Sequence, residues 1–301
     1  MTEHKKLLLI MNPRSGTMQA AKMLADIIQE FSKEGYMTTV MMTQARNDAR
    51  EWAKKYANDY DRIVVSGGDG TFNELVDGIL ESGSKPTIGY IPAGSTNDFA
   101  VSLGLPKSIR KAAEVAVTGT PQDLDIGNFN GRHFSYVASF GAFTSTSYSV
   151  PQNLKNILGH FAYMLSGVKD VLSIKPIQAK VIADPGTDHE VVHEGKFLFG
   201  AVCNCRSIGG VVRLYKQGID MNDGLMEVFL VRMPKDLIEI NKIVGQVLSN
   251  NLNTSEMVFF SAENVHIEIE EGTHWTLDGE YEPGAPTVDI KAIKSAIKII
   301  K

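Results

Sequence analysis

A chain of 301 residues is about twice the length of a typical domain, so its size predicts two domains. Hydrophobic residues make up 43% of the chain and charged residues 22%, with 27 glycines and 11 prolines, which excludes a largely disordered, collagen-like or coiled-coil protein. The formal net charge of -5 argues against a general nucleic-acid-binding protein, which would be basic.

Cysteine usage and apolar run length predict the compartment. The two cysteines, Cys203 and Cys205, form a C-x-C inside an apolar run, which indicates a reducing compartment and no disulfide framework. Apolar runs such as Leu7–Met11 are far shorter than the ~20 residues of a membrane-spanning helix. That run stops at Asn12-Pro13, too early for a signal peptide. We expect a soluble, cytoplasmic protein that can still visit a membrane surface.

The first 120 residues alternate short aliphatic runs with helical stretches. The predicted strands are Leu7–Met11, Thr38–Met42, Arg62–Ser66 and Thr87–Ile91, and the predicted helices are Ala20–Lys33, Asp48–Tyr60 and Thr71–Glu81. Continuous hydrophobicity within the strands is typical of a parallel sheet covered on both faces. Because ligands bind at the carboxyl ends of the strands in such sheets, we expect the functional residues in the turns there.

After Asp125 the pattern changes to short strands separated by turn signals. The turns are Asn130-Gly131, Pro185-Gly186, Asn222-Asp223-Gly224, Asp278-Gly279 and Pro283-Gly284. The β-rich stretches include Met226–Val231 and Val265–Ile269, and helical stretches interrupt them at Asn153–Leu172 and Leu237–Asn250. We predict an α/β protein: a Rossmann-like parallel-sheet domain over residues 1–123 and an antiparallel β-sandwich-like domain over residues 124–301.

Gly67-Gly68-Asp69-Gly70-Thr71 follows the third predicted strand and opens the third predicted helix. Glycines here let the backbone approach a phosphate closely, and the amides at a helix N-terminus bind anions. Asp69 is unusual in a phosphate loop unless a cation or a reacting hydroxyl lies there. The alternative interpretation is a plain strand-to-helix turn.

Two similar loops follow the first and fourth predicted strands. Asn12–Gly16 offers Ser15 as a helix cap and Arg14 for a phosphate, although an ordinary capped turn explains it equally well. Pro92–Ala100 adds a third glycine, serine and threonine loop. Three such loops at one sheet edge are stronger evidence than any one of them. A Walker A sequence and the kinase H-R-D set are absent, so neither of those folds applies.

Three motifs together resemble the diacylglycerol kinase catalytic family, which includes soluble bacterial lipid kinases and the sphingosine and ceramide kinases. They are N-P-x-S-G at 12–16, S-G-G-D-G-T-F-N-E at 66–74 and P-x-G-S-T-N-D-F-A at 92–100. The resemblance continues through Asp125-Ile126-Gly127, Asn222-Asp223-Gly224 and Asp278-Gly279-Glu280, and so covers nearly the whole chain. G-G-D-G-T alone would also fit NAD kinases and phosphofructokinases.

The resemblance implies a role for each matching position. The nucleotide-contacting positions are Asn12, Pro13, Arg14, Ser15, Gly16, Thr43, Gly67, Gly68, Asp69, Gly70, Thr71, Phe72, Asn73, Ser95 and Thr96. Asp69 matches an acidic residue linked to magnesium through water. Asp223 matches a structural magnesium ligand, with Asp220 and Leu225 at positions that offer backbone carbonyls. Glu280 matches the proposed general base, with Asp278 beside it.

The resemblance therefore implies an ATP- and Mg²⁺-dependent lipid kinase, with diacylglycerol as the first acceptor to consider and phosphatidic acid as its product. Residues 1–123 would bind ATP and residues 124–301 the lipid, with a C-terminal tail that could pack back on the first domain. A peripheral, transient contact with the membrane is expected, nucleic acid is not expected as a partner, and a homodimer is left open.

Two other functions stay open at this point. One is a kinase for another lipid hydroxyl, such as phosphatidylglycerol or a sphingoid base, or for NAD. The other is a catalytically silent nucleotide- or lipid-binding regulator, against which the intact Asp69, Asp223 and Glu280 weigh. The two late motifs, Asn222-Asp223-Gly224 and Asp278-Gly279, are also favourable hairpin turns in their own right.

His189-Glu190-Val191-Val192-His193 matches the zinc motif H-E-x-x-H, but its flanks predict a hairpin. In a strand the two imidazoles would lie roughly 13 Å apart, too far to share one zinc ion, so we reject a zinc site.

The chain also departs from the family pattern, because Val101, Thr17 and Ser166 stand where basic residues are common, although Lys22 keeps a positive charge near Thr17. The stretch Lys155–Lys169 is the candidate membrane contact, with a core helix as the alternative.

Overall fold

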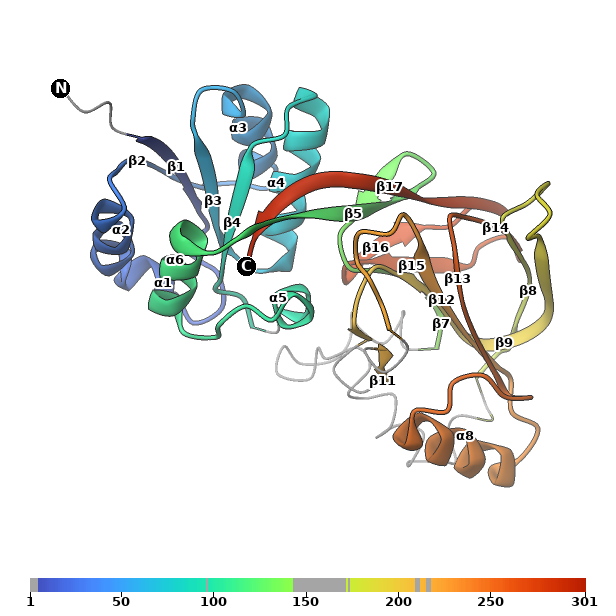
Figure 1. Ribbon diagram of the computed structural model, residues 1–301. Helices are drawn as coiled ribbons and strands as arrows, with labels where there is room; N and C mark the ends of the chain where they lie inside the picture. Colours follow the sequence, from blue (N-terminus) through green and yellow to red (C-terminus); the bar gives the residue numbers. More distant parts are fainter. Residues whose placement is uncertain (1–4, 96, 143–171, 173, 209–211, 215–217) are drawn as a thin grey trace. The chain divides into compact units, whose positions relative to one another are not determined.

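The computed structural model describes residues 5–95, 97–142, 172, 174–208, 212–214 and 218–301 (Figure 1). The chain forms two compact units. The first comprises the residues up to Leu124 together with Ser295–Lys301, and the second is Asp125–Lys294. Each unit has a hydrophobic core of its own.

The first unit is built on a parallel sheet. Its strands are β1 (Lys5–Met11), β2 (Tyr36–Met42), β3 (Arg62–Gly67) and β4 (Thr87–Pro92), in the order β2-β1-β3-β4. The end of β17 (Thr287–Ile300) adds a further parallel partner beside β4. The helices are α1 (Gln19–Lys22), α2 (Leu24–Lys33), α3 (Asp48–Tyr56), α4 (Asp69–Ser82), α5 (Asp98–Leu103) and α6 (Ile109–Thr118). In register, Met11 pairs with Met42 and Ser66, so the carboxyl ends of the strands meet at one edge.

Helices cover both faces of this sheet, so its inner strands β1, β3 and β4 are buried along most of their length. Residues Leu7–Met11 are all fully buried. Leu7, Leu9 and Met11 pack in one cluster with residues of α1, α2 and α6, whereas α3 and α4 lie on the other face (Figure 1). Gly78 lets α3 and α4 approach closely, because a Cβ there would lie 2.2 Å from the Arg50 carbonyl oxygen.

The parallel α/β fold is confirmed, with local differences. The helix predicted over Ala20–Lys33 is interrupted at Met23, whose backbone (φ −98°, ψ 17°) separates α1 from α2. The helix predicted to reach Tyr60 ends at Tyr56, where Asn58-Asp59 favours a turn. Neither α5 nor α6 was predicted: α5 has only six residues, too few for a clear helical period.

The second unit is antiparallel, as predicted. Its strands are β5 (Pro121–Phe129, which begins in the first unit), β6 (Arg132–Phe134), β7 (Val137–Gly141), β8 (Ile177–Ala183), β9 (Val191–Cys203), β10 (Ser207–Ile208), β11 (Val212–Arg213), β12 (Met226–Arg232), β13 (Met257–Ala262), β14 (Asn264–Ile269), β15 (His274–Leu277), β16 (Glu280–Pro283) and most of β17. The main path runs β16-β15-β7-β9-β8-β14-β17, and β12 links β9 to β13. One helix, α8 (Leu237–Ser249), follows β12 as expected.

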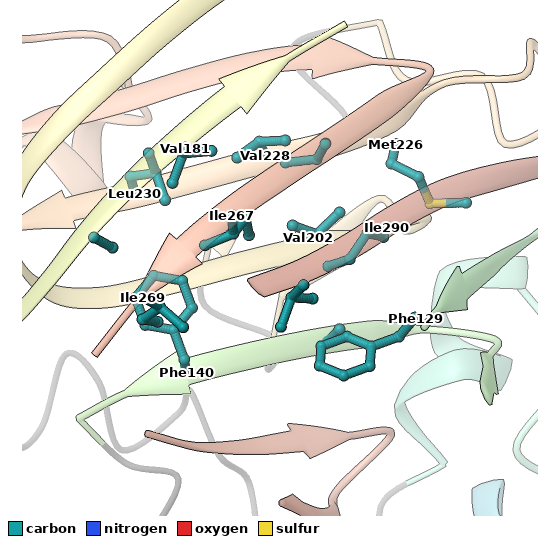
Figure 2. Close-up of a cluster of buried hydrophobic side chains, with 14 of the residues drawn as sticks. Phe129, Phe140, Val181, Val202, Met226, Val228, Leu230, Ile267, Ile269 and Ile290 are labelled. Carbon is teal, nitrogen blue, oxygen red and sulfur yellow. The ribbon is translucent and has the colours of Figure 1, made fainter. Parts of the chain in front are cut away.

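Strand β9 shows how pairing sets the burial pattern. Its first half pairs with β8 and is largely exposed, whereas the second half pairs with both β7 and β12 and is buried at every position. The core of the unit draws on nearly every strand, with Val181, Val228, Ile267 and Ile290 from four strands lying in one cluster (Figure 2). One apolar cluster therefore holds the antiparallel sheet together.

Three further expectations concern the candidate membrane contact, the rejected zinc motif and membrane-spanning helices. Residues 153–171, which include the candidate membrane contact Lys155–Lys169 and Ser166, lie outside the described residues. His193 of the rejected zinc motif lies in β9, paired with Val181 of β8, so the expected hairpin is observed. Among the helices that the structure describes, none is long and apolar enough to cross a membrane.

Candidate functional site

Three loops meet at the carboxyl edge of the parallel sheet, after β1, β3 and β4. The Ser15 hydroxyl oxygen accepts a hydrogen bond from the Gly68 amide at 3.0 Å, which joins the first loop to the second. The Asn12 side-chain amide donates to Thr71 Oγ1 at 3.1 Å and makes a further link between them. The Ala93 amide donates to the Gly67 carbonyl at 2.7 Å and joins the second loop to the third.

Close packing of these loops requires glycine, and we call the group Ser15, Gly16, Gly68 and Gly94 the glycine corner. A Cβ on Gly94 would lie 2.6 Å from Gly68 Cα, and one on Gly16 would lie 2.4 Å from the Ala93 carbonyl oxygen. Gly16 also has φ +52°, a conformation that L-residues with side chains rarely adopt. At Gly16 and Gly94 the loops therefore approach more closely than a side chain would allow.

Helix α4 begins at this corner. Gly68 is its N-cap in extended conformation, and no side chain caps the helix end. The first turn of a helix leaves N–H groups without intrahelical partners, and the helix dipole adds a partial positive charge. The corner is thus suited to bind an anion such as a phosphate.

Asp69 adds a negative charge beside this anion site. Its carboxylate accepts a hydrogen bond from the Asp98 amide at 3.1 Å and one from the Tyr90 hydroxyl at 3.4 Å. Burial raises the pKa of Tyr90 well above its usual value, and the Asp69 charge raises it further. Burial also raises the pKa of Asp98. A carboxylate held next to a phosphate site can receive a cation there.

The remaining predicted nucleotide positions differ in what they offer. The Thr43 amide donates to the Met11 carbonyl at 2.9 Å, which places Thr43 beside the first loop. Arg14 is exposed, and its backbone amide donates a hydrogen bond to Asn12 Oδ1 at 3.0 Å. Ser95 is exposed, and Pro13 and Asn73 are partly exposed. Thr96 lies outside the described residues.

Phe72 lies beneath the second loop. Its ring is fully buried and packs against Tyr90 and Phe99, with ring centroids 4.7 and 4.9 Å away. Its amide donates to the Gly68 carbonyl at 3.1 Å. The ring is therefore part of the core beneath the loop, and a nucleotide contact at this position stays a prediction.

In the second unit, Asp278 and Gly279 form the two-residue turn between β15 and β16, with φ +50° and +85°. The hairpin predicted here is confirmed. The Asp278 carboxylate accepts three amide hydrogen bonds, from Ser135 at 2.7 Å and from Tyr136 and Val137 at 2.9 Å each. Burial of this carboxyl raises its pKa to about 6, although the three amides act in the opposite direction. Asp278 therefore fixes the turn to the segment before β7.

Glu280, the first residue of β16, is bound by Arg132 of β6. An Arg132 guanidinium nitrogen lies 3.0 Å from Glu280 Oε2, and Arg132 also forms an ion pair with Glu282. Both pairs are partly exposed, so each adds little to stability, but together they fix the direction of the Glu280 side chain. Sequence reasoning missed Arg132. The available signal was the spacing of Glu280 and Glu282, which places two carboxylates on one face of a strand.

The third predicted group lies in the turn before β12, which we call the Asp223 turn (residues 220–225). Asp223 Oδ1 accepts the Leu225 amide at 2.9 Å, and Asp220 Oδ1 accepts the Asn222 amide at 3.2 Å. Asp125 reaches the same turn, where its Oδ2 accepts the Gly224 amide at 2.6 Å.

Magnesium fits the donors of the Asp223 turn. Across the described part of the chain, no three Asp, Glu, His or Cys side chains are grouped so that they could hold a metal directly. Magnesium does not need three, because it is commonly bound through one or two carboxylates and keeps several waters. Glu227, just beyond the turn, is buried, and its Oε2 has no hydrogen-bond partner among the described residues. Burial raises the pKa of Glu227 to about 8, with Asp223 and Asp125 contributing. This excess of carboxylate is the donor chemistry that a hard cation requires.

Comparison with known proteins adds independent evidence. Residues 6–129 match the family described as the diacylglycerol kinase catalytic domain. The chain is 34% identical over 280 residues to a diacylglycerol kinase of Bacillus subtilis (strain 168), covering 92% of this chain and 90% of that protein. It is 31% identical over 279 residues to a diacylglycerol kinase of Staphylococcus carnosus (strain TM300), covering 92% and 89%.

A solved structure supports the fold. The crystal structure of a diacylglycerol kinase from Bacillus anthracis str. Sterne superposes with a TM-score of 0.75 and 24% sequence identity, covering 100% of this chain and 98% of that one. At this identity the likeness bears on the fold alone.

The glycine corner generates the first prediction. Gly94→Ala places a methyl group against the Gly68 backbone and should separate the loops, lowering the free energy of unfolding by about 1–3 kcal/mol and ATP affinity by at least about tenfold. Gly245→Ala in α8 is the matched control, since a Cβ there meets nothing within 4 Å. Thermal unfolding and calorimetric titration with ATP measure both effects. If Gly94→Ala binds ATP with the parental affinity, the glycine corner is not part of the nucleotide site.

Proposed function

The chain belongs to the diacylglycerol kinase family, and from that premise we propose that it transfers the γ-phosphoryl group of ATP to the hydroxyl of diacylglycerol, giving phosphatidic acid. It is a lipid kinase, and ATP is its phosphate donor. The observation that carries the proposal is the glycine corner, where three loops meet at a helix N-terminus and glycines let their backbones approach closely.

The glycine corner would bind the phosphates of ATP. Backbone amides near Gly68, together with Ser15 and Asn12, would orient the phosphates, and exposed Arg14 would add positive charge. Phosphoryl transfer depends mainly on positioning and charge neutralisation, so a rigid arrangement of donors is what the reaction needs from the protein. Residues 1–123 would thus be the ATP-binding domain.

Glu280 would act as the general base. A carboxylate near the acceptor hydroxyl can take its proton as the phosphoryl group leaves ATP. Arg132 would hold the Glu280 side chain in one direction, and Asp278 would fix the turn that carries it. Residues 124–301 would then bind the lipid, which the protein would meet at the cytoplasmic surface of the membrane through a peripheral, transient contact.

Asp223 would bind magnesium through its carboxylate, with Asp220 and Leu225 offering backbone carbonyls. Asp69 would take part at the nucleotide through a water molecule. When bound, magnesium supplies positive charge that offsets the phosphate and carboxylate charges. The donors at both places are oxygen atoms, which is the ligand type magnesium prefers.

Labelled phosphate tests the proposed activity directly. The protein is incubated with γ-labelled ATP, magnesium and mixed micelles that contain one lipid each: diacylglycerol, phosphatidylglycerol, a sphingoid base or no acceptor. Labelled phosphatidic acid should form with diacylglycerol at a rate at least about tenfold above the other lipids. Label transferred only to another lipid would show that this lipid, and not diacylglycerol, is the acceptor. Transfer to none of them would contradict a lipid kinase.

Glu280→Gln keeps the side-chain shape and removes the proton acceptor. Turnover with diacylglycerol should fall by ~10²- to 10⁴-fold while ATP affinity stays near the parental value. Glu282→Gln is the matched control, because Glu282 binds the same arginine from the same strand. Near-parental turnover in Glu280→Gln would mean that another group takes the proton.

Asp223→Ala tests the magnesium site. In parental protein without nucleotide, magnesium should raise the melting temperature, because a ligand that binds only the folded state stabilises it. Asp223→Ala should lose that increase and also lose activity. Asp188→Ala, at an exposed turn of the β8–β9 loop, should keep both. If magnesium raises the melting temperature of Asp223→Ala and the parent equally, Asp223 does not bind magnesium and acts only as a turn residue.

A further inference from the structure

Glu227 is a buried carboxylate for which neither the glycine corner nor the hairpin provides a role. It is the second residue of β12, lies opposite Cys203 of β9 and is 1% exposed. Its neighbours Met226 and Val228 belong to the apolar cluster of the second unit. Because side chains alternate along a strand, Glu227 faces the other side of the sheet, away from that cluster.

The charges around Glu227 are unfavourable for a carboxylate. Its Oε2 accepts no hydrogen bond from any described residue. Among the described residues, the carboxylates of Asp223 and Asp125 both disfavour a negative charge on it. Lys294 lies at the same turn, but its ammonium donates to the backbone carbonyl of Asp223 at 3.1 Å. A buried oxygen without a donor is costly, and like charges beside it add to the cost.

Asn204 presents a second unpaired oxygen beside the same turn. Its side chain is fully buried, and its Nδ2 donates to the backbone carbonyls of Asp125 at 2.7 Å and Met221 at 3.2 Å. These two acceptors fix the orientation of the amide, because a flipped amide would place its oxygen against both carbonyls. Asn204 Oδ1 then has no partner in the described part of the chain.

A hydrated divalent cation would satisfy all of these groups at once. The unpaired oxygens would accept hydrogen bonds from its waters, and its charge would offset the carboxylates. A water molecule alone would supply donors but leave the negative charges together. Because no three metal-ligating side chains are grouped among the described residues, the ion would be held directly by Asp223 and the two backbone carbonyls, and Glu227 and Asn204 would meet its bound waters. Magnesium retains several waters when proteins bind it.

We propose that Glu227 and Asn204 form the buried wall of the magnesium site at the Asp223 turn, where Glu227 Oε2 and Asn204 Oδ1 accept hydrogen bonds from magnesium-bound water. The inference rests on the proposed magnesium site and adds two residues to it. It also assigns a role to a buried carboxylate that faces away from the apolar cluster around Met226 and Val228 and forms no ion pair with a described residue.

Magnesium titration without ATP or lipid tests this site without using activity. The melting temperature is followed against magnesium concentration for the parent, Glu227→Gln and Glu227→Asp. Glu227→Gln should raise the half-maximal magnesium concentration by about 10- to 100-fold, the range typical of lost outer-sphere partners. Glu227→Asp, which keeps the charge on a shorter side chain, should show a smaller increase.

Two further variants complete the experiment. Glu30→Gln is the matched control, because Glu30 is another buried carboxylate, 6% exposed, paired with Arg110 and Lys33 in the first unit. It should lower the melting temperature in EDTA and leave the magnesium midpoint unchanged. Asn204→Ser removes the unpaired amide oxygen and should shift the midpoint in the same direction as Glu227→Gln, even if the Glu227 variants do not fold.

The outcomes separate this proposal from the magnesium site itself. If the parent responds to magnesium, Asp223→Ala does not, and the folded Glu227 or Asn204 variants keep the parental midpoint, then the buried wall is wrong and the site at Asp223 stands. If the parent shows no response to magnesium, the site at Asp223 fails and the buried wall fails with it. A shift in the Glu30→Gln midpoint equal to that of Glu227→Gln would also overturn the proposal.

Discussion

The contact between the backbones at Gly68 and Gly94 is the constraint on which the first unit depends. It brings the loops after β3 and β4 closer than any side chain allows, and Ser15 joins the loop after β1 to them. The parallel sheet makes this meeting possible, because its register aligns the carboxyl ends of neighbouring strands. Binding of phosphate here would therefore follow from strand order and glycine placement, with few side chains involved.

Carboxylates in this protein differ in how their charge is offset, and the difference suggests their roles. Glu280 is held by an arginine at partial exposure, which suits a group that must meet a substrate. Asp278 is enclosed by three backbone amides and fixes a turn. Glu227 forms no ion pair with a described residue, its Oε2 has no donor among them, and we assign it to magnesium.

The sequence predicted the fold best where one physical signal dominates. Continuous apolar runs indicated the parallel strands, and Asp278-Gly279 indicated a hairpin because both residues tolerate positive φ. The glycine loops were identified because close backbone approach excludes side chains. Arg132, Tyr90, Asn204 and Glu227 were missed, since their roles depend on contacts between segments far apart in sequence. The burial of the Phe72 ring was not predicted for the same reason, because only its packing against Tyr90 and Phe99 shows it.

Hydrogen exchange measured by mass spectrometry, with and without ATP, tests the central claim most directly. If the glycine corner holds the phosphates, ATP should slow exchange in peptides that cover residues 12–18, 67–73 and 93–95 together, because one ligand contacts all three loops. Strands of the second unit, such as β8, should exchange at the same rate in both states. Binding of ATP with no slowing in these three loops would contradict the account.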